Sequence, residues 1–365
     1  MREKQAIYFI AKCLTLHLFK ERINEVKQAI ATDKINWDKI VKVSSGHMVI
    51  PALYLNLKKA NLLSCLPKDL VTYFAKITRL NKKRNLALLK QAKEIDVLLQ
   101  ERGIIPVFFK GTAHLSENLY QDIAERMLGD IDFLVKKSQI KKAANILINK
   151  GYYPLNKDFK SDKNSAKHYN RLANNNAIAA VEIHWQIVNP PYKSKLDYNT
   201  IFDSKLLKSG LFVPGYNIQA IHNILNVQIN DKGLLYGKIM LRQLYDGYLL
   251  SFKPGVLKAL KNYPYNFYLK NTYLRNIKEL FKTNHLEFNK SFLLNVLMLR
   301  YNFRIAFPKA NKSINIIIYL FLRSYKYFKI LFQAIYSKEQ RNYIYMRIRN
   351  PKWYKKHILS YINRT

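Results

Sequence analysis

Cysteine is scarce in this chain, and the two cysteines that it has stand far apart. Cys13 and Cys65 form neither a cluster with metal-ligand spacing nor a disulfide framework. This pattern argues against a small disulfide-stabilised secreted domain and against a cysteine-based metal site. A reducing, cytoplasmic setting is the expected one.

Long apolar runs are also lacking. The segment 6–14 is interrupted by Lys12, and no small-residue cleavage site follows it, so we expect no signal peptide. Near the C-terminus, the apolar run 314–322 contains Asn315 and stops at Arg323. It is too short to span a bilayer. The sequence therefore predicts no transmembrane segment, and at most a peripheral position at a membrane.

Acidic residues are few beside the basic ones, with 24 Asp and Glu against 62 Lys and Arg and a formal net charge of +38. Compositional drift toward Lys, Asn, Ile and Tyr explains part of this excess, but drift alone would also supply glutamates. A surface this positive attracts polyanions and loses that attraction as salt rises. The charge predicts an anionic partner, either an RNA such as tRNA or an anionic membrane surface, without deciding between them.

Hydrophobic residues make up 49% of the 365 residues, so a packed core is expected, with room for more than one domain. Apolar residues at three- and four-residue spacings predict two helices within residues 70–99, the second ending at Gly103. The periodicity divides the chain into a helical lead-in (1–100), a strand-containing core (101–190), a helical extension of that core (191–255) and a basic, aromatic helical region (256–365).

A glycine turn stands near the start of the core. The apolar run 104–109 predicts a strand, and Lys110-Gly111-Thr112 follows it directly, before a stretch that can form a helix. Backbone N–H groups at such a turn can bind phosphate, and Lys110 lies beside them. A single Gly-Thr pair is also typical of an ordinary connection between a strand and a helix.

Two carboxylates, Asp130 and Asp132, stand one residue apart in an apolar strand-like run. Because side chains alternate in a strand, both point the same way while Ile131 and Phe133 point into the core. Two unit charges about 4 Å apart repel by roughly 4 kcal/mol at an effective dielectric near 20. Solvation, protonation of one acid or a bound cation relieves that repulsion. Mg²⁺ is the cation with chemical use, and a strand end with two solvated acids is the alternative.

A β-hairpin is predicted further along, with a turn at Asn174-Asn175-Asn176. On its second strand, Glu182 and His184 share one face. Two aspartates and a third carboxylate are what a two-metal phosphoryl-transfer site requires. Lys110 or Arg126 would neutralise charge on the β and γ phosphates of a bound triphosphate, with backbone N–H groups near Gly111 as further donors.

Three segments resemble the nucleotidyltransferase superfamily of DNA-polymerase-β type. They are Lys110-Gly111, Arg126-x-x-x-Asp130-Ile-Asp132-Phe-Leu-Val and Glu182-Ile-His184-Trp185. Within the superfamily, the chain is most similar to the bacterial branch called uncharacterised nucleotidyltransferases, over roughly residues 40–255. The resemblance implies an α+β fold with a small mixed sheet flanked by helices. It also implies a divalent metal, Mg²⁺ or Mn²⁺, and transfer of a nucleoside monophosphate from an NTP such as ATP to a hydroxyl acceptor, which it does not identify.

Carried over residue by residue, the resemblance implies that Asp130, Asp132 and Glu182 are the metal ligands. Lys110, Gly111, Thr112 and Arg126 would border the triphosphate. We interpret His184 as a structural residue behind the ligands, because a neutral imidazole is a poor ligand for Mg²⁺. His222 and Asp246 are interpreted as capping residues or surface pairs, with a supporting role in the site as the alternative.

Two other functions remain open at this stage. The high positive charge and the basic, aromatic C-terminal region fit a non-catalytic protein that binds nucleic acid or an anionic surface on an inactive version of the fold. Metal-assisted hydrolysis of a phosphoester needs the same three carboxylates but no acceptor.

Overall fold

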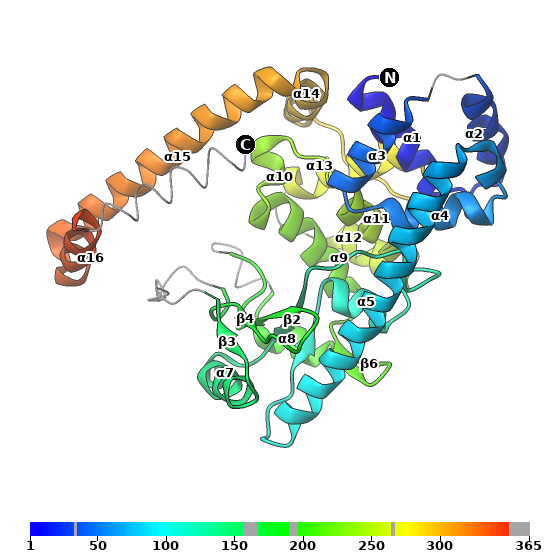
Figure 1. The fold of residues 1–365 in the computed structure, drawn as a ribbon. Coiled ribbons are helices and arrows are strands. Elements are labelled where there is room, and N and C mark those ends of the chain that lie inside the picture. Colours follow the sequence, from blue (N-terminus) through cyan, green and yellow to red (C-terminus); the bar gives the residue numbers. More distant parts are fainter. Residues whose placement is uncertain (33–34, 156–166, 190–195, 264–266, 350–365) are drawn as a thin grey trace. The chain divides into compact units, whose positions relative to one another are not determined.

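The computed structural model describes residues 1–32, 35–155, 167–189, 196–263 and 267–349. Contacts divide the chain into two compact units, residues 1–298 and residues 299–365, and each is described by itself (Figure 1). Unit 1 contains the strands of the described residues, and the described part of unit 2 is helical. The combination of helices with a small mixed sheet confirms the predicted α+β class.

Unit 1 contains a sheet of five strands in the order β1-β2-β5-β4-β3. Strands β2 and β5 are parallel, and the other neighbouring pairs are antiparallel, so the sheet is mixed. The register of the parallel pair sets Asp132 directly opposite Glu182. The strands are β1 (Val107–Phe108), β2 (Asp130–Leu134), β3 (Tyr153–Pro154), β4 (Leu172–Ala173) and β5 (Ala180–His184).

The two longest strands of this sheet have one apolar and one polar face. Their apolar side chains are buried in a core that α5 (Lys68–Gln100) and α7 (Ile140–Asn149) complete. Each buried branched or aromatic side chain contributes about 1.5–3 kcal/mol, and a slip of one residue would turn all of them out of the core. The acids of both strands therefore fall on the opposite face. The residues of β2 and β5 in this core are Ile131, Phe133, Val181 and Ile183, whereas Asp132, Leu134 and His184 are buried on the opposite face.

Helix α5 is one continuous element of 33 residues, where the sequence analysis predicted two helices. That prediction was wrong because the polar residues that interrupt the apolar periodicity are themselves compatible with a helix. Asn81, Arg84 and Asn85 bond to backbone carbonyl groups in the segment 123–129, so they belong on the inner side of α5. After the helix, Gly103 has a φ of 73°, the left-handed conformation that glycine adopts easily.

The predicted helical extension contains a hairpin that the sequence analysis missed. Strands β6 (Leu206–Lys208) and β7 (Leu211–Val213) are antiparallel, and Ser209 and Gly210 between them both have positive φ. Two successive positive φ angles are typical of a tight hairpin turn, but three-residue strands are too short to give a readable alternation. The helical elements of this region are α8 (Tyr198–Asp203), α9 (Tyr216–Leu225), a π-helical turn (Asn226–Asn230), α10 (Gly233–Tyr236) and α11 (Leu241–Leu250).

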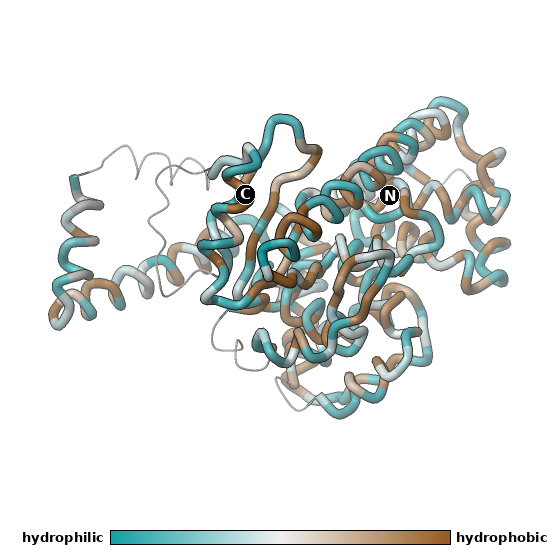
Figure 2. The backbone as a smooth tube through the Cα atoms, turned by 90° about the horizontal axis from the view of Figure 1, so that it is seen from below, coloured by the Kyte–Doolittle hydropathy of each residue, from teal (hydrophilic) through white to brown (hydrophobic). Residues whose placement is uncertain are grey.

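Among the described residues, the N-terminal and C-terminal regions are helical, as predicted, and residues 350–365 lie outside the described part. In Figure 2, hydrophobic and hydrophilic residues alternate along the tube, and none of the described helices has the length and the apolar run that crossing a membrane requires. These helices are α1 (Glu3–Leu14), α2 (Arg22–Ala31), α3 (Trp37–Gly46), α4 (Ile50–Lys59), α12 (Val256–Asn262), α13 (Phe267–Phe281), α14 (Phe292–Ala306), α15 (Pro308–Tyr336) and α16 (Lys338–Ile348).

Candidate functional site

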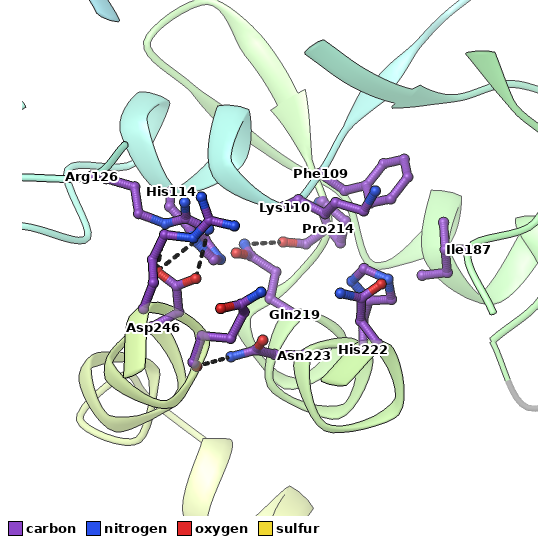
Figure 3. Close-up of a pocket in the computed structure, with 13 residues that line it drawn as sticks. Phe109, Lys110, His114, Arg126, Ile187, Pro214, Gln219, His222, Asn223 and Asp246 are labelled. Atoms are coloured by element: carbon purple, nitrogen blue, oxygen red, sulfur yellow. Dashed lines mark hydrogen bonds and ion pairs between the residues drawn. The ribbon is translucent and has the colours of Figure 1, made fainter. Parts of the chain in front are cut away.

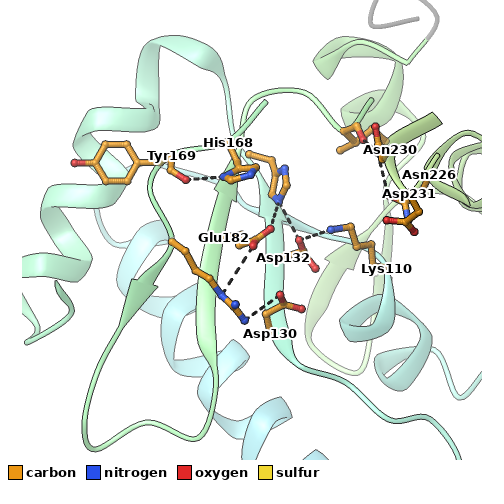
Figure 4. Close-up of polar contacts among 12 residues, drawn as sticks. Lys110, Asp130, Asp132, His168, Tyr169, Glu182, Asn226, Asn230 and Asp231 are labelled. Carbon is orange, nitrogen blue, oxygen red and sulfur yellow. Dashed lines mark hydrogen bonds and ion pairs between the residues drawn. The ribbon is translucent and has the colours of Figure 1, made fainter. Parts of the chain in front are cut away.

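The polar face of the sheet brings together acids from two parallel strands (Figure 4). Asp132 on β2 and Glu182 on β5 are register partners, and His184 follows two residues later on the same face. One ligand atom from each of these three residues lies within 4.8 Å of the other two. Segments about 50 residues apart in the sequence thus form one compact acidic group.

His184 orients both carboxylates. Its Nε2 lies 2.9 Å from Oδ1 of Asp132 and 3.3 Å from Oε2 of Glu182. Because an ionised carboxylate only accepts hydrogen bonds, we infer that Nε2 carries the hydrogen and donates it. The imidazole is fully buried, and its ring meets the ring of Phe109 edge to face. In this tautomer Nε2 has no lone pair to offer a cation, so His184 holds the acids in position.

Lys110 supplies the nearest positive charge. Its Nζ lies 2.6 Å from Oδ1 of Asp132. The backbone of Lys110 has a φ of 55°, a conformation that costs a non-glycine residue about 1 kcal/mol or more, and it immediately precedes α6 (Gly111–Ser116). The strained turn therefore directs the chain from β1 into α6 while the Lys110 side chain reaches the carboxylates.

Gly111 and Thr112 form the first turn of α6. A Cβ atom added at Gly111 would lie 2.0 Å from Cδ2 of Leu128, so any larger residue would force the Leu128 side chain to move where α6 packs against the segment that leads into β2. The Thr112 side chain is buried, and its hydroxyl has no hydrogen-bond partner among the described residues. These two residues lie beside Lys110, and the group that Thr112 can present to a ligand is its backbone.

Arg171 is a second cation at the acidic group, and the sequence analysis did not identify it. It precedes β4, and its Nη2 lies 3.2 Å from Oδ2 of Asp130 while its Nε lies 3.9 Å from Oε1 of Glu182. The register that pairs Leu172 with Val181 in the core sets Arg171 on the polar face. Asp130 is therefore joined to the group through Arg171.

Burial opposes the charge on all three acids, and their neighbours decide which are most readily ionised. At Asp132, the Lys110 ammonium and the hydrogen bond from His184 outweigh burial and hold the pKa below its usual range. At Glu182, burial is again outweighed, chiefly by the hydrogen bond from His184, and the pKa is lowered. Burial, together with the charges of Asp132 and Glu182, raises the pKa of Asp130. The three acids thus form a negative group that a cation stabilises.

Arg126 lies in a separate, buried ion pair. Its Nε and Nη2 are 2.8 and 2.7 Å from the two carboxylate oxygens of Asp246 on α11. Asp246 is only 1% exposed and also accepts a hydrogen bond from Tyr120. The interpretation of Asp246 and His222 as surface pairs was wrong, because both side chains are buried, and both line the cavity described next. The apolar periodicity around them carries no signal that distinguishes a buried ion pair from a surface one.

A cavity of about 70 Å³ opens between Lys110 and this ion pair (Figure 3). Arg242 also lines it and donates through Nη1 to the carbonyl of Met127. Burial, with the charges of Lys110 and Lys167, lowers the pKa of His222 well below its usual value, so its imidazole is neutral. Nε2 of His222 has no hydrogen-bond partner among the described residues. The lining is completed by side-chain amides from Gln219, Asn223, Asn226 and Gln243 and by His114, Phe109, Ile187 and Pro214.

The model of the uncharacterised nucleotidyltransferase family matches residues 33–254. The chain belongs to this family. The match includes all three acids, Lys110, the Arg126–Asp246 pair and every residue that lines the cavity. No curated protein and no solved structure matches the chain. The resemblance stated from the sequence is therefore confirmed at the level of the family.

Two further charged residues of this nucleotidyltransferase-family site come from outside its motifs. Burial and the charge of Lys110 lower the pKa of Lys167 to about 8. Asp231 follows the π-helical turn, accepts a hydrogen bond from Asn226, and has a pKa raised by burial despite the charges of Lys110 and Lys167. Nothing in the sequence marked either residue, because only the folding of distant loops brings them to the sheet.

The acidic group fits a hard divalent cation. Carboxylate oxygens are the ligands that Mg²⁺ and Mn²⁺ prefer, and Asp132 and Glu182 offer such oxygens close together. Asp130 lies two residues before Asp132 on the same face of β2. The basic, amide-lined cavity lies on the other side of Lys110 and fits an anion. In this nucleotidyltransferase-family chain, Lys110 thus contacts the acidic group and also lines the basic cavity.

Proposed function

We propose that the protein transfers a nucleoside monophosphate from an NTP to a hydroxyl acceptor, with Asp130, Asp132 and Glu182 as ligands of Mg²⁺ or Mn²⁺. The observation that carries the proposal is the parallel register of β2 and β5, which sets Asp132 opposite Glu182. Membership of the nucleotidyltransferase family supports the reaction class. Metal ions held by these acids would neutralise charge on the triphosphate and acidify the attacking hydroxyl.

The residues of the chain have separate tasks in this proposal. The three acids bind and orient the ions, and His184 keeps Asp132 and Glu182 in one arrangement through its donated hydrogen bonds. Lys110 donates to a phosphate oxygen when the nucleotide enters. Its ammonium has three N–H donors, so it can bond to the phosphate as well as to Asp132.

The phosphates extend from Lys110 toward the cavity. Lys110 and Arg242 give that side a positive potential, since the charge of Arg126 is balanced by Asp246, and the carboxamides donate hydrogen bonds without adding charge. Gly111 and Thr112 contribute through the backbone beside Lys110, since the Thr112 side chain is buried. Arg126 acts from the cavity wall, where Asp246 holds its guanidinium in place.

The test is a labelling experiment with the full chain. The protein is incubated with Mg²⁺ or Mn²⁺ and each α-³²P NTP in turn, alone and with total RNA, with proteins and with small hydroxyl compounds. We expect covalent label in one acceptor, and loss of at least 1,000-fold in rate in the combined variant Asp130→Asn with Asp132→Asn. Asp203→Asn, at an exposed position on α8, is the matched control and keeps the wild-type rate.

Two results would overturn the proposal. Label transfer that persists in the double variant removes the acids from the reaction. Release of free nucleotide without any acceptor identifies a phosphoester hydrolase instead. The alternative of a non-catalytic polyanion-binding protein, suggested by the +38 charge, predicts steeply salt-dependent RNA binding that survives loss of all three acids.

A further inference from the structure

Helix α15 of unit 2 exposes a continuous hydrophobic face. The exposed fractions of Ile317, Phe321 and Phe328 are 65%, 72% and 69%. At 3.6 residues per turn, these side chains and four others fall within a sector of about 120°. The other members of this apolar face are Leu320, Leu331, Phe332 and Ile335, and all four are exposed.

The other side of α15 carries positive charge only. Lys312, Asn315 and Arg323 lie on it beside Leu322 and Ile330, and the helix from Pro308 to Tyr336 contains no acidic residue. Arg323 donates to the hydroxyl of Tyr327 at 2.8 Å and also bonds to Tyr319. The basic residues in the sequence of this helix are Lys309, Lys312, Arg323, Lys326 and Lys329.

A face of this kind is unfavourable in water. Burying one Leu, Ile or Phe side chain stabilises a protein by about 1.5–3 kcal/mol, and seven such side chains lie side by side on α15. Contiguous exposed apolar surface on this scale marks an interaction site. The apolar residues occupy one side of α15, so a partner would bind the helix from that side.

The charge decides between the surfaces that could cover it. An amphipathic helix with Phe and Leu on one face and Lys and Arg on the other is typical of a helix lying in the plane of a membrane. Each Lys or Arg near an anionic leaflet contributes about 1 kcal/mol of attraction. RNA would pair with the cations but would leave the apolar face in water. A second copy of the chain would cover the apolar face but would bring like charges together.

We propose that α15 binds the surface of a membrane rich in anionic lipids, with its apolar face at the level of the upper acyl chains and its basic residues among the headgroups. The apolar residues supply the burial, and the absence of acids from the helix selects a negative surface. The proposal concerns unit 2 alone and does not depend on nucleotidyl transfer.

The test measures flotation of the full chain with vesicles. Vesicles of phosphatidylcholine with 30% phosphatidylglycerol are compared with vesicles of phosphatidylcholine alone at about 0.15 M salt. We expect binding to the anionic vesicles only, weakening as salt rises. The combined variant Phe321→Glu with Phe328→Glu is expected to lower the affinity at least tenfold.

Two further variants make the result specific. Leu86→Glu with Val97→Glu introduces the same charge at exposed apolar positions of α5 in unit 1, and it should leave binding unchanged. Arg323→Gln with Lys329→Gln keeps the apolar face and should lower both the affinity for anionic vesicles and its salt dependence. Circular dichroism and the thermal midpoint report whether each variant is folded.

Three outcomes would overturn the proposal. The first is vesicle binding that the Phe321→Glu, Phe328→Glu variant keeps. The second is equal binding to the two kinds of vesicle. The third is no vesicle binding, together with dimerisation or RNA binding that this variant loses, which would show that a second copy or RNA covers α15.

Discussion

Single residues decide how three carboxylates share one face of a small sheet. Lys110 supplies positive charge next to Asp132, and Arg171 supplies it next to Asp130 and Glu182. The Nε2–H group of His184 lies within reach of both Asp132 and Glu182. Without these partners, repulsion between the acids would move the carboxylates apart or raise their pKa values until one was protonated. The geometry of the site is therefore a property of these partners as much as of the acids.

The role of His184 can be separated from that of a metal ligand. His184→Ala removes the donor to both acids, and we expect kcat to fall at least tenfold with little change in KM for the NTP, because the acids lose their orientation. His184→Gln keeps an N–H donor at a similar place and should restore part of kcat. Steady-state kinetics with the labelled NTP measure both values. A Gln variant that is no better than the Ala variant would contradict a positioning role.

A buried glutamate outside the site makes stability depend on pH. Burial raises the pKa of Glu125 from its ordinary value of 4.5 to about 7 in the folded protein. Below pH 4.5 the Glu125 carboxyl is protonated in both the folded and the unfolded protein, and its contribution to stability is complete. As the pH rises from 4.5 through 7, this contribution is lost, because the carboxyl ionises in the unfolded chain at a lower pH than in the folded protein. At 1.36 kcal/mol per pKa unit, the loss is about 3 kcal/mol.

Glu125→Gln should remove this dependence. We expect the free energy of unfolding of the variant, relative to the wild type, to increase between pH 5 and pH 8. Urea denaturation at several pH values measures it. Glu94→Gln, an exposed position on α5, is the control and should show the same difference at every pH. A constant difference for Glu125→Gln as well would mean that this carboxyl titrates normally.

Among the helices and strands, α5 positions both strands that carry the acids. Arg84 donates to the carbonyls of Leu128 and Gly129 before β2 and to that of Ile178 before β5. Gln91 donates to the carbonyl of Ala179 at 2.8 Å and accepts from its N–H at 3.1 Å. One helix thus fixes where the two parallel strands begin, and with that the pairing of Asp132 with Glu182.

The contact of Gln91 with Ala179 can be tested by one substitution. Gln91→Leu keeps the helix and the approximate volume, but it leaves the buried N–H and C=O of Ala179 without the Gln91 partner and also removes the hydrogen bond to the Tyr152 hydroxyl. We expect a loss of about 2–4 kcal/mol in the free energy of unfolding, together with slower nucleotidyl transfer. Gln28→Leu, at an exposed position of α2, is the control and should change stability little. Equal effects of the two substitutions would show that α5 does not fix the start of β5.

The sequence was sufficient for the elements whose pattern is local. The alternation in Asp130–Leu134 and Ala180–His184 predicted two half-buried strands with Asp132 and Glu182 on their polar faces, and the register confirms their convergence. Arg171, Lys167 and Asp231 could not be found in this way, because their places depend on loops packing against a distant sheet. The unbroken α5 was missed for a related reason, since its polar residues are inward-facing partners of another segment.

At the scale of the whole molecule, unit 1 extends beyond the family match of residues 33–254 at both ends. Arg22 of α2 donates to the carbonyls of Phe281 and Lys282 at the C-terminal end of α13, a link across about 260 residues. The N-terminal helices therefore pack against the end of α13, and residues on both sides of the matched region belong to the same compact unit. Within that region, the Arg126–Asp246 pair joins the segment before β2 to α11 across 120 residues of sequence.

This buried pair is the internal contact whose disruption should cost most. Asp246→Asn leaves the Arg126 guanidinium buried without a counter-charge, and we expect the free energy of unfolding to fall by about 3–5 kcal/mol. Replacing both partners, with Arg126→Met and Asp246→Leu together, removes the unpaired charge and should cost less than the single change. Urea denaturation measures all three proteins.

The control is the exposed pair of Lys12 and Glu25, whose charged groups lie 2.6 Å apart at the surface. Glu25→Gln should cost less than about 1 kcal/mol, because water and salt screen an exposed pair. If Asp246→Asn costs no more than Glu25→Gln, the link between α11 and the approach to β2 is not what holds unit 1 together. If the double substitution is as costly as Asp246→Asn, the loss reflects packing in the cavity wall rather than an uncompensated charge.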